Sequence, residues 1–206
     1  ILAGGSGTRL APITFSISKQ LMPVYDKPMI YYPLSTLMLS GIREIQIITT
    51  PSEKINFEKL LGQGEHLGID IRYKVQPNPN GIAEAFLLSQ NFLGNSPSAL
   101  ILGDNLFHGN ELIEQLQIAN KRTVGSTIFA YHVSNPESYG VIEFDSHGKP
   151  KDIIEKPKKA KSNYAITGLY FYDNQVIEYA KNIRPSKRGE LEISSINQVY
   201  LEHNNL

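Results

Sequence analysis

The first residues of the chain combine a loop poor in side chains with two cations, which is a combination suited to binding phosphate. An apolar triplet at positions 1–3 leads into this loop, and the residues concerned are Gly4, Gly5, Gly7, Thr8, Arg9 and Lys19. Glycines let backbone N–H groups approach a ligand closely. A guanidinium and an ammonium can then share the oxygens of a polyphosphate. The same pattern also fits a tight turn after a strand, with both cations in solvent.

Two well-known glycine motifs do not match this loop. The dinucleotide-binding fingerprint requires a glycine at position 10, which is Leu10 here. The P-loop requires Gly-Lys-Ser/Thr after four spacer residues, and that sequence is absent. A Rossmann NAD site and a Walker A site are therefore excluded.

Two further segments are candidates for a nucleotide site. Asp104 ends an apolar run, so its carboxylate would lie at the same sheet edge as the glycine loop. There it could bind an Mg²⁺ ion that bridges phosphates. The alternative is that it caps the following turn. Gln76 and Gly81 flank a loop that Pro77 and Pro79 stiffen. The side-chain amide matches the donor and acceptor edge of thymine or uracil, and the glycine would let the backbone approach the base. An ordinary polar turn is the alternative.

Four positions in the second half of the chain suit a sugar phosphate. Glu155 and Lys156 end a predicted strand. A carboxylate accepts hydrogen bonds from two sugar hydroxyls, and an ammonium binds phosphate. Tyr139 and Gly140 open another strand, where the glycine amide is accessible to a hydroxyl. An exposed strand end and a plain strand entry are the structural alternatives.

Thr167 and Arg188 are weaker candidates in the same half. Thr167 and Gly168 interrupt an apolar strand, which indicates a bulge or a close approach of ligand. Arg188 precedes a predicted helix, at whose N-terminus its guanidinium could reach a phosphate. Capping or packing would explain both residues equally well.

The elements that must position these residues alternate through the first part of the chain. β-Branched runs and helical spacing predict strands at 44–50, 69–75 and 99–102, and helices at 28–40, 52–61, 82–92 and 111–121. Alternation of this kind is typical of parallel strands with crossover helices. From residue 125 on, strands are predicted at 126–133, 141–144, 152–155 and 165–172, and a helix at 190–206. We therefore expect an α/β fold with a Rossmann-like, mostly parallel sheet that becomes mixed, flanked by helices, in one domain.

Composition excludes several classes of function. The chain has no cysteine, which rules out a disulfide framework, a thiolate zinc site and thiol catalysis, and fits a reducing cytoplasm. Its 20 Lys and Arg balance 20 Asp and Glu, so no net charge favours nucleic acid or an acidic membrane. No apolar run reaches the roughly 18 to 20 residues of a membrane helix. The strand-like start and the uncapped helical pattern at the end lead us to expect a chain trimmed at both ends.

Taken together, these blocks resemble the sugar-1-phosphate nucleotidyltransferase family. The segments that carry the resemblance are 4–10, 19–23, 76–77, 103–105, 155–157 and 188–193, and segment 25–34 is similar to the members that use dTTP and glucose 1-phosphate. The resemblance covers essentially the whole chain. It implies a nucleotide-binding half at 1–124 and a β-rich sugar-binding half at 125–206.

The resemblance also implies site residues. The implied catalytic residues are Arg9, Lys19 and Asp104. The implied nucleotide-binding residues are Gly4, Gly5, Gly7, Thr8, Arg9, Lys19, Gln76, Gly81 and Asp104. The implied contacts of the sugar phosphate are Asn105, Tyr139, Gly140, Glu155, Lys156, Thr167 and Arg188. Similar enzymes bind Mg²⁺ with this Asp and with a second Asp from a later segment, which would follow Leu206.

The implied reaction is attack of glucose 1-phosphate on the α-phosphorus of dTTP, which forms dTDP-glucose and pyrophosphate. Similar enzymes are cytoplasmic homotetramers, with no nucleic-acid or membrane partner. Use of UTP or another sugar 1-phosphate is the nearest alternative. A glycosyltransferase would show an Asp-x-Asp motif, whereas Leu106 stands two residues after Asp104. An inactive nucleotide-binding module also stays open, because Ala11 replaces a larger ring-bearing residue usual in the family.

Overall fold

The chain folds into two compact units. A computed structural model describes residues 1–5 and 7–206, and for Arg9 the backbone only. The first unit comprises Ile1–Pro79 and Leu100–Lys121, and the second comprises Asn80–Ala99 and Arg122–Leu206. Strand β6 (Ser98–Ile101) runs across this division.

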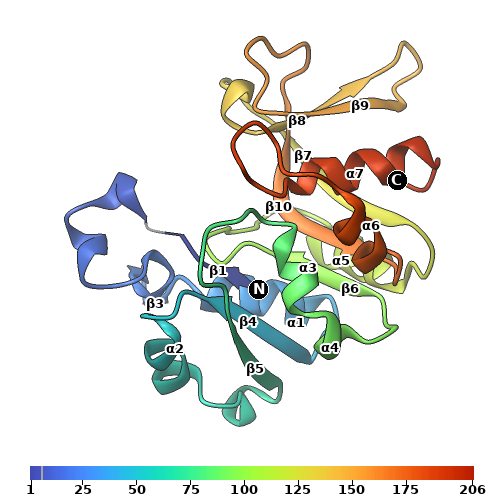
Figure 1. Ribbon diagram of the computed structural model, residues 1–206. Coiled ribbons are helices and arrows are strands. Elements are labelled where there is room, and N and C mark those ends of the chain that lie inside the picture. The colour runs from blue at the N-terminus through green and yellow to red at the C-terminus, as the bar shows by residue number, and fades with distance from the viewer. Residues whose placement is uncertain (6) are drawn as a thin grey trace. The chain divides into compact units, whose positions relative to one another are not determined.

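A parallel sheet forms the centre of the first unit (Figure 1). Its strands are β1 (Leu2–Ala3), β4 (Glu44–Thr49) and β5 (Asp70–Val75), in the order β1-β4-β5. Leu2 also forms a parallel bridge with Leu102, so β1 lies between β4 and the segment after β6. The central strand β4 is largely buried, as its β-branched residues Ile45, Ile47 and Ile48 predict.

Three helices belong to the first unit: α1 (Tyr31–Leu39), α2 (Lys54–Leu61) and α5 (Leu112–Lys121). Helix α2 packs against β5, and α1 packs against α5. Before α1, the chain forms 3₁₀ turns at Thr8–Leu10, Ile13–Phe15 and Lys19–Leu21, and a hairpin of β2 (Pro23–Val24) and β3 (Lys27–Pro28). A further 3₁₀ turn covers Glu65–Leu67.

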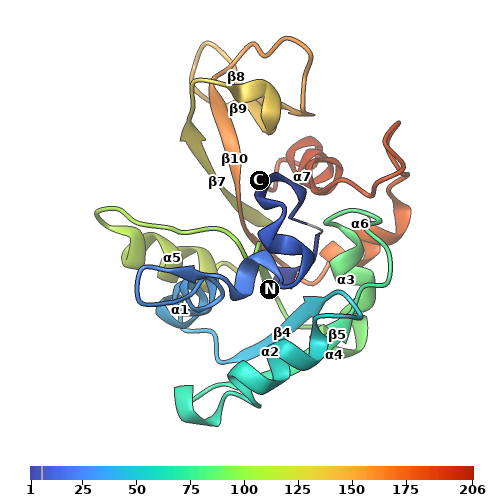
Figure 2. The same ribbon diagram turned by 90° about the vertical axis from the view of Figure 1, so that its left-hand side faces the viewer.

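The second unit is built around antiparallel strands. They are β7 (Ser126–His132), β8 (Gly140–Phe144), β9 (Pro150–Glu155) and β10 (Tyr164–Tyr172), with a 3₁₀ turn at Pro136–Ser138. Figure 2 shows β7 and β10 side by side. Strand β10 pairs with both β7 and β8, and β8 pairs with β9, all antiparallel. The predicted change from a parallel to a mixed pattern near residue 125 is therefore confirmed.

Four helices accompany these strands: α3 (Glu84–Leu88), α4 (Gln90–Leu93), α6 (Val176–Asn182) and α7 (Ile193–Glu202). Helix α7 packs against β9 and α6, and α6 packs against α3. In α7 the residues Ile193, Ile196 and Tyr200 are buried at helical spacing. Among the described helices, none is long and apolar enough to cross a membrane.

Several elements of the structure differ from the prediction. The helix expected at 82–92 is two short helices separated at Ser89, whose carbonyl accepts the N–H groups of Phe92 and Leu93 and so starts a new turn. The helix expected at 190–206 begins at Ile193, because residues 186–192 form a loop closed by its own hydrogen bonds, and it ends at Glu202. Helix α6 was not predicted at all, since it is only seven residues long.

Candidate functional site

A pocket of about 240 Å³ in the first unit brings together most of the residues predicted to bind a nucleotide. Its lining residues are Gly4, Gly5, Gly7, Thr8, Leu10, Lys19, Gln20 and Asp104. The predicted side chain of Arg9 lies outside the described part of the chain, as does Ser6.

The parallel sheet explains why these residues meet. Strand β1 ends at Ala3 and continues into Gly4, while Asp104 follows the bridge between Leu2 and Leu102. The Gly103 N–H donates to the Leu2 carbonyl at 2.8 Å. Because the two neighbouring segments are parallel, both loops leave the sheet at its carboxyl edge, which is where open α/β sheets bind ligands.

The glycine loop presents its backbone to open space. Gly5 has φ +95°, and a Cβ built on it would meet nothing within 4 Å. Gly7 has φ +59° and faces the protein, because a Cβ there would lie 2.8 Å from Thr14 Cγ2. The Thr14 hydroxyl donates to the Gly7 carbonyl at 2.9 Å and fixes the turn. The positive φ favours glycine at both positions, and packing against Thr14 favours it further at Gly7.

Lys19 and Asp104 form an ion pair in this pocket. The Lys19 ammonium donates to Asp104 Oδ2 at 2.9 Å, and each side chain is 33% exposed. The described residues contain no group of three or more His, Cys, Asp or Glu that could hold a metal. One carboxylate beside an open pocket does fit Mg²⁺ bound mainly through substrate phosphates and water, which is its usual mode in phosphate-binding sites.

Two buried glutamines lie beside the loop. Gln20, which is 4% exposed, donates from Nε2 to the Gly4 carbonyl at 3.2 Å and accepts from the Ser18 hydroxyl at 2.5 Å. Gln76 is 8% exposed and directly follows β5; its Oε1 would lie 3.5 Å from a Cβ built on Gly4. Gln76 was predicted as a base contact. Gln20 was not predicted, although it stands beside Lys19 in a segment that carries the family resemblance.

The candidate residues of the sugar phosphate lie mainly in the second unit, and only Asn105 belongs to the first. Asn105 follows Asp104 in a turn, where its N–H donates to the Leu102 carbonyl at 3.2 Å. In the second unit the Arg188 guanidinium lies 2.7 Å from Glu190, 3.6 Å from Glu192 and 3.7 Å from Glu155. The structure therefore brings Arg188 and Glu155 together.

Glu155 and Glu192 are carboxylates in a partly buried cluster. Burial raises the pKa of the Glu155 carboxyl, and the negative charge of Glu192 raises it further, against the opposite effects of Ser194, Lys156 and Arg188. Glu192 is only 6% exposed and accepts a hydrogen bond from the Ser186 hydroxyl at 2.7 Å. Sequence reasoning missed Glu192, because a glutamate in a charged loop is usually solvated.

Lys156 occupies a strained backbone position directly after β9. Its φ is +41°, in the left-handed region that non-glycine residues rarely adopt. The Lys156 ammonium lies 3.9 Å from Glu155 Oε1, and its N–H donates to the Tyr139 carbonyl at 3.0 Å. Backbone strain of this kind clusters at functional sites.

Gly140 pairs with Glu155 across β8 and β9. A Cβ built on Gly140 would lie 3.2 Å from Glu155 Oε2, so the glycine leaves room for that carboxylate. Thr167 lies where the pairing of β10 with β7 shifts register between Ile166 and Tyr170. The structure thus shows a register shift where the sequence indicated a bulge or a close approach of ligand. The Thr167 hydroxyl donates to the Phe129 carbonyl at 3.0 Å, which is the packing role that the sequence left open.

Gly81 lies in the second unit, and the close approach it permits is to the chain itself. It has φ +110°, and a Cβ built on it would lie 2.5 Å from Leu191 N. Packing against Leu191 therefore requires glycine here whether or not a base binds. The predicted contact of Gly81 with a base stays a prediction.

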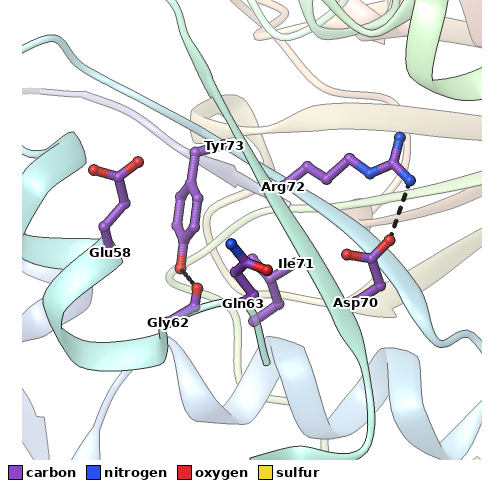
Figure 3. A pocket seen from close by; sticks show the side chains of 7 residues that line it. All are labelled: Glu58, Gly62, Gln63, Asp70, Ile71, Arg72 and Tyr73. Atoms are coloured by element: carbon purple, nitrogen blue, oxygen red, sulfur yellow. Dashed lines mark hydrogen bonds and ion pairs between the residues drawn. The ribbon is translucent and has the colours of Figure 1, made fainter. Parts of the chain in front are cut away.

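A second pocket in the first unit, of about 470 Å³, contains none of the predicted residues (Figure 3). It is lined by Glu58, Gly62, Gln63, Asp70, Ile71, Arg72 and Tyr73. The Tyr73 hydroxyl donates to the Gly62 carbonyl at 2.6 Å, and Arg72 pairs with Asp70 at 3.2 Å (Figure 3). Desolvation, aided by the negative charge of Glu58, raises the pKa of Tyr73 to about 12. The polar groups of Tyr73, Arg72 and Asp70 in this second pocket are thus engaged in contacts within the protein.

Comparison with known proteins identifies the class to which this fold and site belong. Residues 1–206 match the family model described as nucleotidyl transferase. The chain therefore belongs to the nucleotidyl transferase family, and the resemblance drawn from its motifs is confirmed.

Two relatives of high identity share one name. The glucose-1-phosphate thymidylyltransferase of Xanthomonas campestris pv. campestris (strain B100) is 59% identical over 206 residues, which are 100% of this chain and 70% of that protein. The glucose-1-phosphate thymidylyltransferase of Mycobacterium tuberculosis (strain ATCC 25618 / H37Rv) is 56% identical over 100% of this chain and 71% of its own length.

Solved structures agree with the fold. A crystal structure described as a glucose-1-phosphate thymidylyltransferase from Bacillus anthracis, in complex with sucrose, superposes with a TM-score of 0.90 at 40% identity and covers 100% of this chain and 82% of that one. A UDP-glucose pyrophosphorylase complexed with UDP-glucose gives a TM-score of 0.82 at 26% identity and covers 100% and 86% of the two chains. The predicted fold class is therefore confirmed.

Proposed function

We propose that this protein transfers the thymidylyl group of dTTP to glucose 1-phosphate. The observation that carries the proposal is the pocket in which the bare glycine loop, Lys19 and Asp104 meet, in a chain that matches thymidylyltransferases from end to end. A phosphate oxygen of glucose 1-phosphate attacks the α-phosphorus in line. The bond from the α-phosphorus to the bridging oxygen breaks, and pyrophosphate leaves with that electron pair.

The protein's task in this reaction is to hold two anions together. The attacking phosphate oxygen is already ionised near neutral pH, so no general base is needed. Backbone N–H groups of the glycine loop and the cations Arg9 and Lys19 bind the triphosphate and stabilise charge on the departing pyrophosphate. Asp104 is the residue that would hold Mg²⁺, whose chemistry here would be neutralisation of phosphate charge.

In the second unit, the hydroxyls and phosphate of the sugar are the proposed ligands of the charged cluster. Glu155 accepts from sugar hydroxyls, the amide of Gly140 donates to one, and Lys156 and Arg188 bind the phosphate. This cluster contains three carboxylates and two cations, so with all groups ionised it carries one net negative charge; its members are Glu155, Glu190, Glu192, Lys156 and Arg188. We expect Arg188 to exchange part of its carboxylate contacts for the phosphate when the sugar phosphate binds.

A pyrophosphate-release assay tests the reaction. Mg²⁺ and glucose 1-phosphate are supplied, and dTTP, UTP, ATP and CTP are compared. We expect dTTP to be used best. Preference for UTP would favour the UDP-glucose reaction, to which the solved structure at 26% identity is related by name. No release with any nucleotide would favour a binding module without catalysis.

The assembly and location of the protein are proposed on the family resemblance alone. The proposed assembly is a homo-oligomer, tetrameric as in similar enzymes, and the proposed location is the cytoplasm. Light scattering coupled to size-exclusion chromatography tests the first, and fractionation of the source cells tests the second.

A further inference from the structure

The loop that contains Gly81 is tied by its backbone to the segment that carries Arg188. The Leu191 N–H donates to the Asn80 carbonyl at 2.7 Å, and the Ala83 N–H donates to the Leu191 carbonyl at 3.1 Å. Two hydrogen bonds in opposite directions hold Leu191 between Asn80 and Ala83. Neither segment can shift without straining the other.

The contact is unusually close at Gly81. With φ at +110°, a side chain there would overlap the backbone N and the carbonyl oxygen of Leu191. The contact is therefore backbone against backbone, without flexible side chains between the two segments. A small displacement of one segment is passed on to the other, because close-packed backbone leaves no space to absorb it.

On its other side, Leu191 belongs to a loop that closes on itself. The Ser186 N–H donates to the Glu190 carbonyl at 2.9 Å, and the Gly189 N–H donates to the Ser186 carbonyl at 2.9 Å. Glu192 binds both the Ser186 hydroxyl and the Arg188 guanidinium. The orientation of Arg188 is thus set by residues adjacent to Leu191.

We propose that Leu191 is a positioning residue that couples occupancy of the base-binding loop at Gly81 to the orientation of Arg188. A nucleotide whose base rests on Gly81 stabilises the loop, and the two hydrogen bonds of Leu191 stabilise residues 186–192 in the geometry that receives the sugar phosphate. The inference rests on the proposed function, which assigns a base to Gly81 and a phosphate to Arg188. Coupling of two sites is reciprocal and commonly amounts to about 5-fold to 150-fold in affinity.

Amide hydrogen exchange of the whole chain tests the coupling, with EDTA present to prevent turnover. The probes are dTTP and inorganic triphosphate, which carries the phosphates without the base. We expect dTTP to slow exchange in residues 79–84 and, about fivefold or more, in residues 186–192. Inorganic triphosphate should leave residues 186–192 unchanged.

A matched pair of variants isolates the backbone of Leu191. Leu191→Ala and Leu191→Gly both remove the side chain, but only the glycine loosens the backbone. We expect Leu191→Gly to lose the dTTP-dependent slowing at 186–192 and to raise KM for glucose 1-phosphate about fivefold or more, with kcat little changed. Leu191→Ala should retain both properties.

Three results would overturn the coupling while dTTP still binds: slowing confined to residues 79–84, equal slowing by inorganic triphosphate, or unchanged coupling in Leu191→Gly. Calorimetry with dTTP separates these from failure of the proposed function. If dTTP does not bind at all, the proposed function is wrong and this inference is wrong with it.

Discussion

The ammonium of Lys19 lies 2.9 Å from Oδ2 of Asp104, across the pocket that the glycine loop borders. The two residues are 85 positions apart in the chain. The parallel bridge between Leu2 and Leu102 places Asp104 beside the glycine loop, and Gln20, next to Lys19, is hydrogen-bonded to that loop at Gly4. In the free protein each neutralises the other. A triphosphate entering the pocket competes with Asp104 for Lys19, and the carboxylate released in this way becomes free to bind a cation.

Replacing Lys19 tests its role as a phosphate contact. We expect Lys19→Met to lower kcat about a hundredfold or more, because one preorganised contact to developing charge is worth roughly 3 kcal/mol. KM for glucose 1-phosphate should change little. Lys27→Met is the control, since Lys27 is a half-buried lysine paired with Asp26 outside the pocket. Equal rates for the two variants would contradict the role of Lys19.

Replacing Asp104 tests the metal. Asp104→Asn removes the charge and keeps the shape, so we expect turnover to fall about a hundredfold or more, and the Mg²⁺ concentration for half-maximal rate to rise. Binding of dTTP in EDTA should be retained or strengthened, because Lys19 no longer has a carboxylate partner. Calorimetry with and without Mg²⁺ measures both effects. An unchanged Mg²⁺ dependence would exclude Asp104 as a metal ligand.

The strained backbone of Lys156 gives a prediction that separates stability from function. Lys156→Gly and Lys156→Ala both remove the ammonium, so both should raise KM for glucose 1-phosphate. Only glycine relieves the positive φ of +41°, and we expect Lys156→Gly to be more stable than Lys156→Ala by about 1 kcal/mol. Urea unfolding of the two variants measures the difference. Equal stability would mean that no strain is present.

Glu155 should make stability depend on pH. Its folded-state pKa is raised, chiefly by burial, so its contribution to stability is present below the pKa of the unfolded carboxyl and is lost as pH rises through the folded pKa. Glu155→Gln removes this titration. The variant should therefore gain stability relative to the parent protein as pH rises above the unfolded pKa of a glutamate, about 4.3.

Asp145→Asn is the matched control for that experiment, with the opposite sign. Hydrogen bonds from the backbone N–H groups of Lys149 and His147 lower the pKa of Asp145, so this variant should lose stability relative to the parent at neutral pH, and the difference should shrink toward acid pH. Urea unfolding midpoints of both variants and of the parent protein, measured from acid to neutral pH, give the direction of each stability change. If the stability of Glu155→Gln relative to the parent fell with rising pH, as that of Asp145→Asn is expected to do, the sign for Glu155 would be wrong.

Much of the fold could be predicted because its strands carry strong local signals. The buried runs around Ile47 and Tyr170 are β-branched or aromatic, and they are strands in the structure. Short elements could not be predicted: α6 and the hairpin of β2 and β3 depend on tertiary contacts, because their sequences carry too few residues for a periodic pattern.

The site could be predicted in part for a related reason. Glycines, prolines and charges at strand ends mark Gly4, Gln76 and Asp104, and the parallel sheet then places them at one edge. Glu192 and Leu191 leave no comparable signal. Their importance comes from burial beside Arg188 and from backbone packing against Gly81, which only the folded chain shows.

A crystal structure of this chain soaked with dTTP in EDTA would show directly where the nucleotide binds. We expect the triphosphate at the glycine loop, with its oxygens within hydrogen-bond distance of the Gly5 and Gly7 amides, and with Lys19 turned from Asp104 to the phosphates. A nucleotide bound elsewhere, with the glycine loop unoccupied and the Lys19–Asp104 pair intact, would contradict it.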